Sequence, residues 1–213
     1  SRDFSVLQIA HLMAKHGKNV LIGECGHASR SAKYFLPTYC GGDKAYPVIN
    51  IMEYTYKVFK EGRLKLDPNG IMEKVAYHDP CNIARSGRIV EQPREILKAI
   101  CADFVEMTPN RTENYCCTGG GGAMSMSEYT PKRLQSAKIK ADQIRATGAK
   151  IVVTSCHNCV DGLQDLIKHY DLGCEVKQLV NLVANALVQP GESKRTTDLR
   201  GEPLPGMEED ADE

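Results

Sequence analysis

The sequence has no tryptophan, no excess of charge of either sign and no long apolar run. Its 27 Lys and Arg offset 27 Asp and Glu, so no long-range field favours nucleic acid or an anionic bilayer. No window of about 18 consecutive apolar residues is present to cross a membrane, and no secretory segment stands at the N-terminus. A chain of 213 residues, 42% hydrophobic and 25% charged, is therefore expected to be globular, with one large or two small domains.

Cysteine is abundant instead, with nine in the chain. An odd number cannot be paired completely within one chain, which weakens a disulfide framework as the explanation. The first residue, Ser1, is not an initiator Met, and we expect the chain to be the C-terminal part of a longer one.

The sequence repeats itself at an offset of 131 residues. When Gly17 is aligned with Gly148, Cys25 falls on Cys156. Each copy reads as an amphipathic helix closed by Gly, then a short apolar strand (Val20 to Gly23; Ile151 to Thr154), then a turn with Cys. The pattern predicts a duplicated α/β lobe whose first copy is incomplete.

Strands and helices alternate through the rest of the chain. We expect strands at Glu73 to His78 and Ala102 to Met107, and helices over 93–100, from Thr130-Pro131 to Gly148, over 160–170 and over 177–188. The predicted fold is therefore α/β, with two pseudo-repeated Rossmann-like lobes and mostly parallel sheets. The predicted domains are part of a first, degenerate lobe (1–70), a complete cysteine-rich lobe (71–188) and a polar tail, disordered or bound to a partner (189–213).

Five cysteines form one pattern, C-x34-C-C-x38-C-x-x-C, made by Cys81, Cys116, Cys117, Cys156 and Cys159. They follow predicted strands or lie in Gly-rich turns, and loops converge at the C-terminal edge of a parallel sheet. Adjacent cysteines do not readily chelate one zinc ion, whereas they can bind different irons of a cluster. The segment Thr118-Gly-Gly-Gly-Gly-Ala123 supports a cluster, since glycines let backbone N–H groups approach sulfur; Gly119, Gly120 and Gly121 are the candidates.

Two alternatives remain open for these motifs. The C-x-x-C pair alone fits zinc or a thiol–disulfide couple equally well. The glycine run could cradle a phosphate, but it lacks the G-K-[ST] ending of a P-loop and is not a G-x-G-x-x-G motif.

The full pattern, opened by His78-Asp79-Pro80-Cys81 and centred on C-C-T-G-G-G-G, resembles the cysteine-rich CCG domain of heterodisulfide reductase B-type subunits. The resemblance covers residues 5–188. It implies tandem copies, the five cysteines as ligands of a [4Fe-4S] cluster, non-cubane in that family, and reduction of a disulfide by that cluster. It also implies that the cluster lies between the two lobes.

The first copy departs from the pattern, because Ala28 stands where the second copy has Cys159. This degenerate E-C-G-H turn resembles the DsrK-like iron–sulfur subunits of DsrMKJOP membrane complexes. The resemblance implies redox partner subunits, one of them a quinone-linked membrane subunit, a small sulfur-carrier substrate of the DsrC type, and a cytoplasmic place peripheral to the inner membrane. Other interpretations are an electron-relay subunit of a 2-hydroxy acid oxidase and a zinc-binding module.

The sequence predicts the roles of the histidines and of the remaining cysteines less specifically. Cys25 and His27 could face the cluster across the lobe interface, with His27 as proton donor to a leaving thiolate or as a packing residue. His78 and His157, which flank ligands, are hydrogen-bond donors to those ligands, spare ligands or turn residues. Three cysteines without a spacing partner are expected to be structural thiols: Cys40, Cys101 and Cys174.

Overall fold

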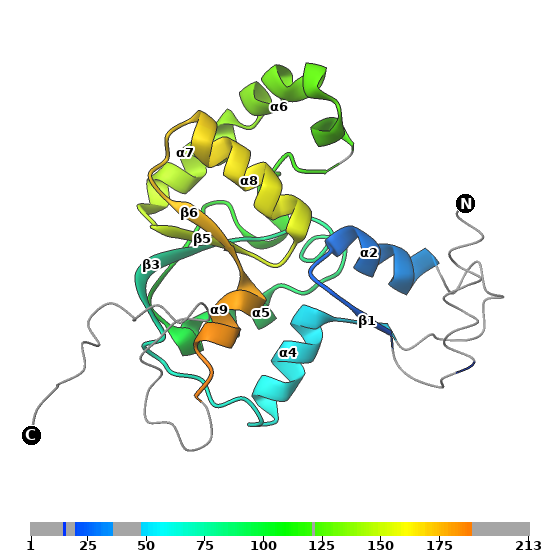
Figure 1. Cartoon of the computed structure of the whole chain (residues 1–213), viewed down its shortest axis with the longest axis vertical. Helices are drawn as coiled ribbons and strands as arrows, with labels where there is room; N and C mark the ends of the chain where they lie inside the picture. The colour runs from blue at the N-terminus through cyan, green and yellow to red at the C-terminus, as the bar shows by residue number, and fades with distance from the viewer. Residues whose placement is uncertain (1–14, 16–19, 36–47, 121, 189–213) are drawn as a thin grey trace, which may run out of the picture.

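The computed structural model describes residues 15, 20–35, 48–120 and 122–188. Two parallel sheets are present in these ranges, one of two strands and one of four. Figure 1 shows the four-stranded sheet with helices around it and the smaller sheet beside it. The α/β class predicted from the sequence is confirmed.

The larger sheet has the strand order β4-β3-β5-β6, and all its pairings are parallel. Its strands are β3 (Ile71–His78), β4 (Cys101–Glu106), β5 (Ile151–Thr154) and β6 (Glu175–Gln178). The whole of β5, IVVT, is buried, as expected for a central parallel strand that is covered on both faces.

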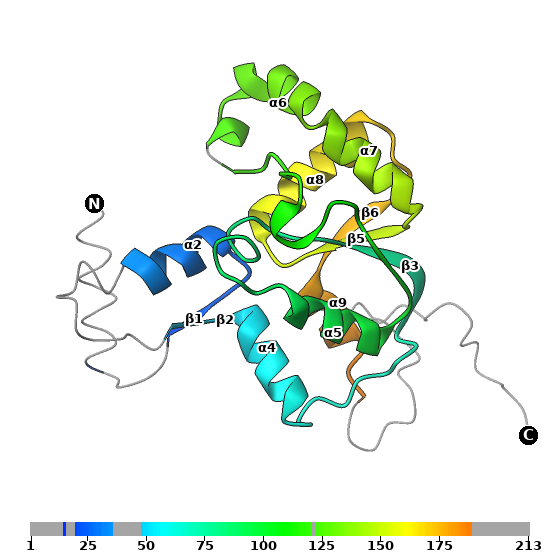
Figure 2. The same cartoon turned by 180° about the vertical axis from the view of Figure 1, so that it is seen from behind.

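Helices cover both faces of this sheet. On one face, Val75 of β3 and Val153 of β5 belong to a core with the helices α4, α5 and α9. On the other, Ala76 and Val152 share a core with α6, α7 and α8. The helices have the bounds Ile51–Lys60 (α4), Glu91–Ile100 (α5), Thr130–Ser136 (α6), Lys138–Thr147 (α7), His157–His169 (α8) and Leu179–Asn185 (α9). Figure 2 shows α4, α5 and α9 gathered at one end and α7 and α8 at the other.

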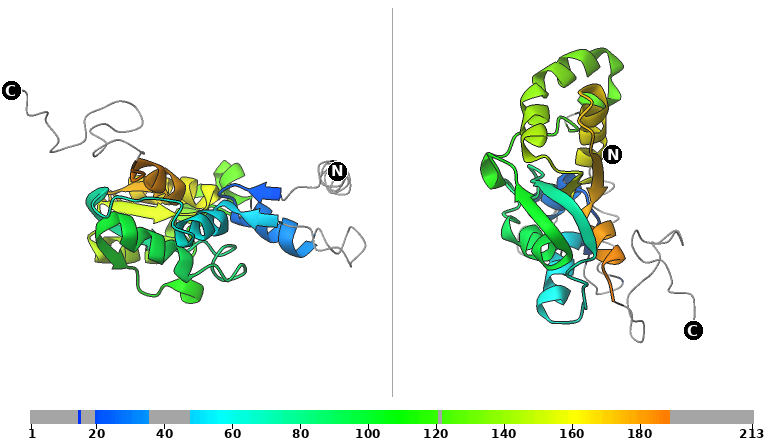
Figure 3. Two further views of the ribbon diagram at one scale, coloured as in Figure 1. Left: turned by 90° about the horizontal axis from the view of Figure 1, so that it is seen from below. Right: turned by 90° about the vertical axis from the view of Figure 1, so that its left-hand side faces the viewer.

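The smaller sheet pairs β1 (Val20–Ile22) with β2 (Val48–Asn50) in parallel. These strands and α2 (Gly26–Arg30) lie together at one end of the molecule (Figure 3). The described elements run β1, α2, the π-helix η1 (Ser31–Phe35), β2 and α4 here, and β5, α8, β6 and α9 in the larger unit. Each unit thus has a parallel strand pair with a helix after each strand.

Core contacts cross the predicted boundary at residue 70. Met52 of α4 is fully buried in the core built by β3, β5, α5 and α9, and Leu66 bridges to Leu187 next to α9. The domain division remains a prediction, and packing joins residues 48–70 to the larger sheet.

The structure divides one predicted helix, shortens another and contains a third helix that the sequence did not predict. The helix expected from Thr130 to Gly148 divides into α6 and α7 at Ala137, and ends as expected in a left-handed Gly148 with φ +63°. The helix expected over 177–188 starts only at Leu179, because Glu175–Gln178 pairs with β5 as a strand. Helix α4 has no counterpart in the sequence prediction; Asn50 and Glu53 form a capping box at its start. The helix expected before Gly17 and the tail after 188 lie outside the described residues.

No helix in the described part of the chain is long and apolar enough to cross a lipid bilayer.

Candidate metal centre

The site lies where the direction of the chain connections changes within the sheet. From β3 the chain continues into α5 on one face, and from the neighbouring β5 it continues into α8 on the other. A crevice forms at such a switch point, outside the carboxyl ends of the strands. Cys81 follows β3, and Cys156 is the N-cap of α8 directly after β5.

A buried ion pair holds the turn that carries Cys81. Asp79 accepts two hydrogen bonds from the Arg94 guanidinium, at 2.8 and 2.7 Å, and one from the backbone N–H of Arg111 at 2.7 Å. Arg94 also binds Glu106 at 2.7 Å, and its guanidinium lies 5.4 Å from the centre of the Tyr77 ring. Asp79 therefore fixes the turn and is not free to bind a metal.

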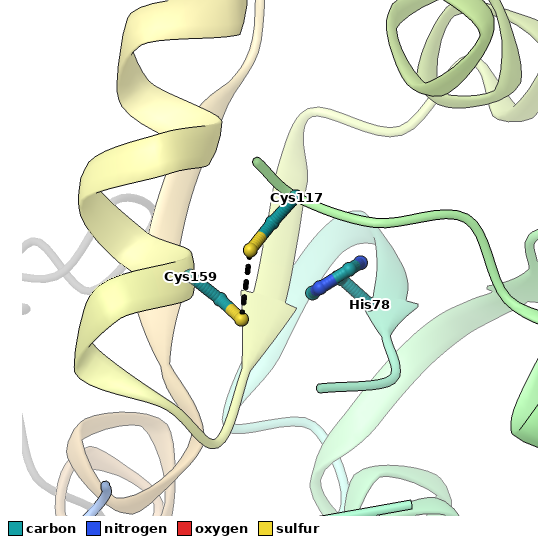
Figure 4. A group of neighbouring side chains, drawn as sticks. All are labelled: His78, Cys117 and Cys159. Carbon is teal, nitrogen blue, oxygen red and sulfur yellow. Dashed lines mark hydrogen bonds between the residues drawn. The ribbon is translucent and has the colours of Figure 1, made fainter. Parts of the chain in front are cut away.

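Two distant segments bring their sulfur atoms together at the start of α8. The spacing of Cys156 and Cys159 places both on one side of the first helical turn, and the Sγ atoms of Cys117 and Cys159 are 3.1 Å apart (Figure 4). Gly119 and Gly162 permit this approach: a Cβ on Gly119 would lie 1.9 Å from the carbonyl oxygen of Asn158, and one on Gly162 would lie 2.6 Å from that of Cys117.

Backbone N–H groups point at the sulfur atoms. Thr118 donates to Cys116 Sγ at 3.2 Å and Gly119 to Cys117 Sγ at 3.4 Å, while the N–H of Gly26 donates to the Cys156 sulfur. Such donors stabilise negative charge on sulfur. Of the other candidate glycines, Gly120 is exposed and Gly121 lies outside the described residues.

The pKa values of the three buried thiols shift in two directions: those of Cys117 and Cys156 are lowered and that of Cys159 is raised. Hydrogen bonds from Cys116 and Cys159 hold the pKa of Cys117 far below its usual range. A hydrogen bond from Cys159 and backbone donors lower the pKa of Cys156 to about 6. Hydrogen bonding with Cys117 and Cys156, together with burial, raises the pKa of Cys159 well above the ordinary value.

The two exposed thiols differ from the three buried ones in accessibility, and the pKa values of both are raised. Cys81 and Cys116 are exposed, whereas Cys117, Cys156 and Cys159 are buried. Burial of part of the side chain and the nearby Cys117 charge raise the pKa of Cys81, and a hydrogen bond to Cys117 raises that of Cys116. All five predicted ligands thus influence one another electrostatically, with two at the solvent edge and three within.

The two histidines of the pattern lie in different environments, one buried beside the thiols and one exposed to solvent. A ring nitrogen of the buried His78 and the Sγ atoms of Cys117 and Cys159 all lie within 4.8 Å of one another (Figure 4). His157 is exposed and points its Nε2 at Asp161, 3.8 Å away. Among the described residues, only the group of His78, Cys117 and Cys159 has the spacing of metal ligands.

The turn of the first copy reaches the site mainly through its backbone. The carbonyl oxygen of Glu24 accepts a hydrogen bond from the N–H of His157 at 2.6 Å. Cys25 is half-buried and caps α2, accepting from the N–H of Ala28 at 3.4 Å, and His27 is exposed. The catalytic roles of Cys25 and His27 remain predictions. Glu24, the first residue of the E-C-G-H turn but not a predicted site residue, is partly buried, and this burial raises its pKa to about 7.

The cysteines outside the pattern lie in the packing. Cys101 is 7% exposed in the core around β3, and burial raises its pKa to about 12. Cys174 packs at the edge of the second core, and Cys40 lies outside the described residues. The cysteines of the described ranges are all free thiols.

Three buried polar residues behind the site carry no periodic or motif signal in the sequence: Arg94, Asn114 and Lys140. Each has a partner in a distant segment of the chain, so spacing could not identify them. For Asn114 alone, the position two residues before Cys116 is a sequence signal of proximity to the site.

Similarity to a known protein family covers the segment that carries the five patterned cysteines. Residues 75–164, which include all five patterned cysteines, match the family model described as CCG, cysteine-rich domain. The chain is 32% identical over 148 residues to a probable membrane-anchored ferredoxin of Chromohalobacter salexigens, covering 69% of this chain and 22% of the relative.

Two further relatives are iron–sulfur or heterodisulfide reductase subunits by name. The chain is 29% identical over 196 residues to the second Hdr-like menaquinol oxidoreductase iron-sulfur subunit of Archaeoglobus fulgidus, covering 86% of this chain and 34% of the relative. It is 28% identical over 187 residues to a dihydromethanophenazine:CoB–CoM heterodisulfide reductase polypeptide of Methanosarcina mazei, covering 87% and 45%. The chain spans less than half the length of each of these three relatives.

Proposed function

Since residues 75–164 form a CCG cysteine-rich domain, we propose that the chain is an iron–sulfur redox subunit that delivers electrons to a disulfide or trisulfide. The observation that carries the proposal is the convergence of Cys117, Cys156 and Cys159 at the switch point of the sheet, with Cys81 and Cys116 at its open edge. The names of the relatives point to the same class of protein.

The donor set fits an iron–sulfur cluster, which we propose to be of the [4Fe-4S] type. Five thiols are more than a tetrahedral zinc site uses, and the adjacent Cys116 and Cys117 can bind different irons. The N–H groups of Thr118, Gly119 and Gly26 supply the donors that thiolates in such sites accept. When bound, the cluster would store and transfer single electrons.

The exposed sulfurs define the side from which a substrate approaches. Cys81 and Cys116 face solvent, whereas the wall behind them is closed by His78 and by Cys117 packed against α8. Cleavage of a disulfide consumes two electrons and two protons and releases two thiols. The electrons would come from a partner redox subunit of the quinone-linked class, and the substrate would be a small sulfur-carrier protein of the DsrC type. Such an assembly would work in the cytoplasm, peripheral to the inner membrane, with the membrane contact made by the partner.

Removal of one ligand tests the centre. The anaerobically purified chain is expected to hold about four iron atoms with matching sulfide, and Cys117→Ala is expected to lose most of both. Cys174→Ala, which removes a thiol outside the pattern, should keep the wild-type content. Zinc without sulfide in the wild-type chain, or an intact cluster in Cys117→Ala, would contradict the proposal.

Electron paramagnetic resonance separates a substrate-reducing subunit from a relay. If the substrate sulfur reaches the cluster, the spectrum of the oxidised protein changes when a thiol product is added. An unchanged spectrum would assign the chain to electron transfer between subunits, as in the electron-relay subunit of a 2-hydroxy acid oxidase.

A further inference from the structure

Lys140 is a fully buried cation with no carboxylate within ion-pair distance among the described residues. Its Nζ donates to Asn114 Oδ1 at 2.6 Å, to Gln143 Oε1 and, at 3.7 Å, to the Met107 sulfur. A buried charge without a counter-charge is strongly unfavourable. Burial lowers the pKa of Lys140 to about 8, and the negative charge of Cys117 is the largest influence that opposes this shift. Asp79 contributes too, but Arg94 already neutralises it.

Lys140 fixes which way the Asn114 amide points. An ammonium group can only donate hydrogen bonds, so the atom of Asn114 that faces it must be the oxygen. The amide nitrogen therefore faces the other way, and it donates to the backbone oxygen of Asp79 and contacts His78 Nδ1 at 3.3 Å. An amide NH2 is only a donor, so His78 Nδ1 must accept.

The hydrogen bonds that run from Lys140 through Asn114 to His78 determine the tautomer of the imidazole ring. With Nδ1 accepting, the proton of the neutral ring is on Nε2. That Nε2 is buried and has no hydrogen-bond partner among the described residues, and the ring is 1% exposed beside Cys117 and Cys159. A buried N–H without a partner is costly, and the described residues place the sulfurs of Cys117 and Cys159 beside the ring as acceptors.

We infer that Lys140 and Asn114 are positioning residues that hold His78 as an Nε2–H donor to the sulfur centre, and that His78 is not an iron ligand. The inference rests on the proposed function. An iron-bound Nε2 would need its lone pair and a proton on Nδ1, which the Asn114 amide opposes. The N–H of His78 and the positive charge of Lys140 both stabilise an added electron, and so raise the reduction potential.

Charge removal tests the role of Lys140. In the reconstituted chain, Lys140→Met is expected to keep its iron and sulfide and to lower the reduced-to-oxidised ratio at the wild-type midpoint about tenfold, which is about 59 mV for a one-electron couple. Lys138→Met on the same helix removes an exposed lysine that pairs with Asp142 and should leave the ratio within about twofold of wild type. Equal effects of the two substitutions, or no effect of either, would overturn the inference.

Reversal of the His78 tautomer tests the role of Asn114 without removal of the Lys140 charge. Asn114→Asp keeps a partner for Lys140 but presents an acceptor to His78 Nδ1, which moves the ring proton away from the sulfur side. Electron–nuclear double resonance in H2O and D2O should show exchangeable protons from the backbone N–H donors in every variant. One further exchangeable-proton coupling, from His78 Nε2–H, should be present in wild type and Lys138→Met and absent in Asn114→Asp. His78→Gln, which retains an N–H donor, should preserve the cluster and most of the potential.

The outcomes distinguish the two levels of the proposal. A wild-type chain that binds no iron and sulfide refutes the proposed function and the inference with it. If the wild-type chain binds both, but Asn114→Asp keeps every exchangeable-proton coupling of the wild type, only the inference is refuted. Strong hyperfine coupling to 15N-labelled histidine, of the size of a directly bound nitrogen, would show that His78 is a ligand, and would also refute it.

Discussion

Arg94 is the side chain on which the turn after β3 depends. It is 1% exposed, it binds the fully buried carboxylate of Asp79 through two hydrogen bonds, and it also binds Glu106. The net stability of such a buried pair is small, because both charges were desolvated to form it. Removal of one partner is different, since it leaves the other charge buried and uncompensated.

Arg94→Met is therefore expected to lower the free energy of unfolding by about 3–5 kcal/mol, measured by urea denaturation. Arg145→Met breaks an exposed pair with Asp142 and should change stability by less than about 0.5 kcal/mol. The double variant Arg94→Met/Asp79→Leu should recover part of the loss. If the double variant is as unstable as the sum of the single ones, the unpaired-charge explanation is wrong.

At the scale of elements, the loop after Cys117 is seated against the first turns of α8. The contact is backbone to backbone, between Gly119 and the segment from Asn158 to Gly162. It sets the distance between the sulfurs of Cys117 and Cys159, because each of these residues lies next to the contact.

Gly119→Ala is expected to push this loop away from α8, since the new Cβ would meet the Asn158 oxygen at 1.9 Å. We expect a loss of roughly 1–3 kcal/mol in stability and a large loss of bound iron, measured by thermal unfolding and by iron analysis. Gly120→Ala is the matched control, because a Cβ there meets nothing within 4 Å. Similar iron contents in the two variants would show that the close approach does not position the cysteines.

At the scale of the whole molecule, the segment 48–70 shares its core with the larger sheet. Met52 on α4 is fully buried against it, and Ser155 at the end of β5 donates to the Met52 sulfur at 3.4 Å. One cooperative unfolding unit is expected from such packing.

Met52→Ala is accordingly expected to lower the free energy of that single transition by about 2–5 kcal/mol, followed by chemical denaturation with circular dichroism and with tyrosine fluorescence. Met72→Ala, which shortens a methionine that is 66% exposed, should be nearly neutral. Two separate transitions, with only the first shifted by Met52→Ala, would show instead that residues 1–70 fold as an independent domain.

The sequence was informative where a signal repeats or stands at a fixed spacing. The parallel strands ending at His78 and Thr154 and the left-handed Gly148 could be predicted, because each depends on local residue types. The five-cysteine pattern is visible from its spacing, and its role as one ligand set stays a prediction. The four-residue strand β6 is too short to show a period, and its end falls within the range predicted to be helical. The network of Arg94, Asn114 and Lys140 could not be predicted, because its partners lie on different elements and meet only after the sheet has formed.

The distribution of charge over the five thiols bears on the chemical durability of the chain before its cofactor arrives. The thiolate is the form of cysteine that reacts with alkylating and oxidising reagents. Here the sulfurs with a lowered pKa, Cys117 and Cys156, are covered, and the accessible ones, Cys81 and Cys116, keep their protons because their pKa values are raised. We therefore expect alkylating reagents in solution to react slowly with the metal-free chain, because its accessible thiols are protonated and its thiolates are buried.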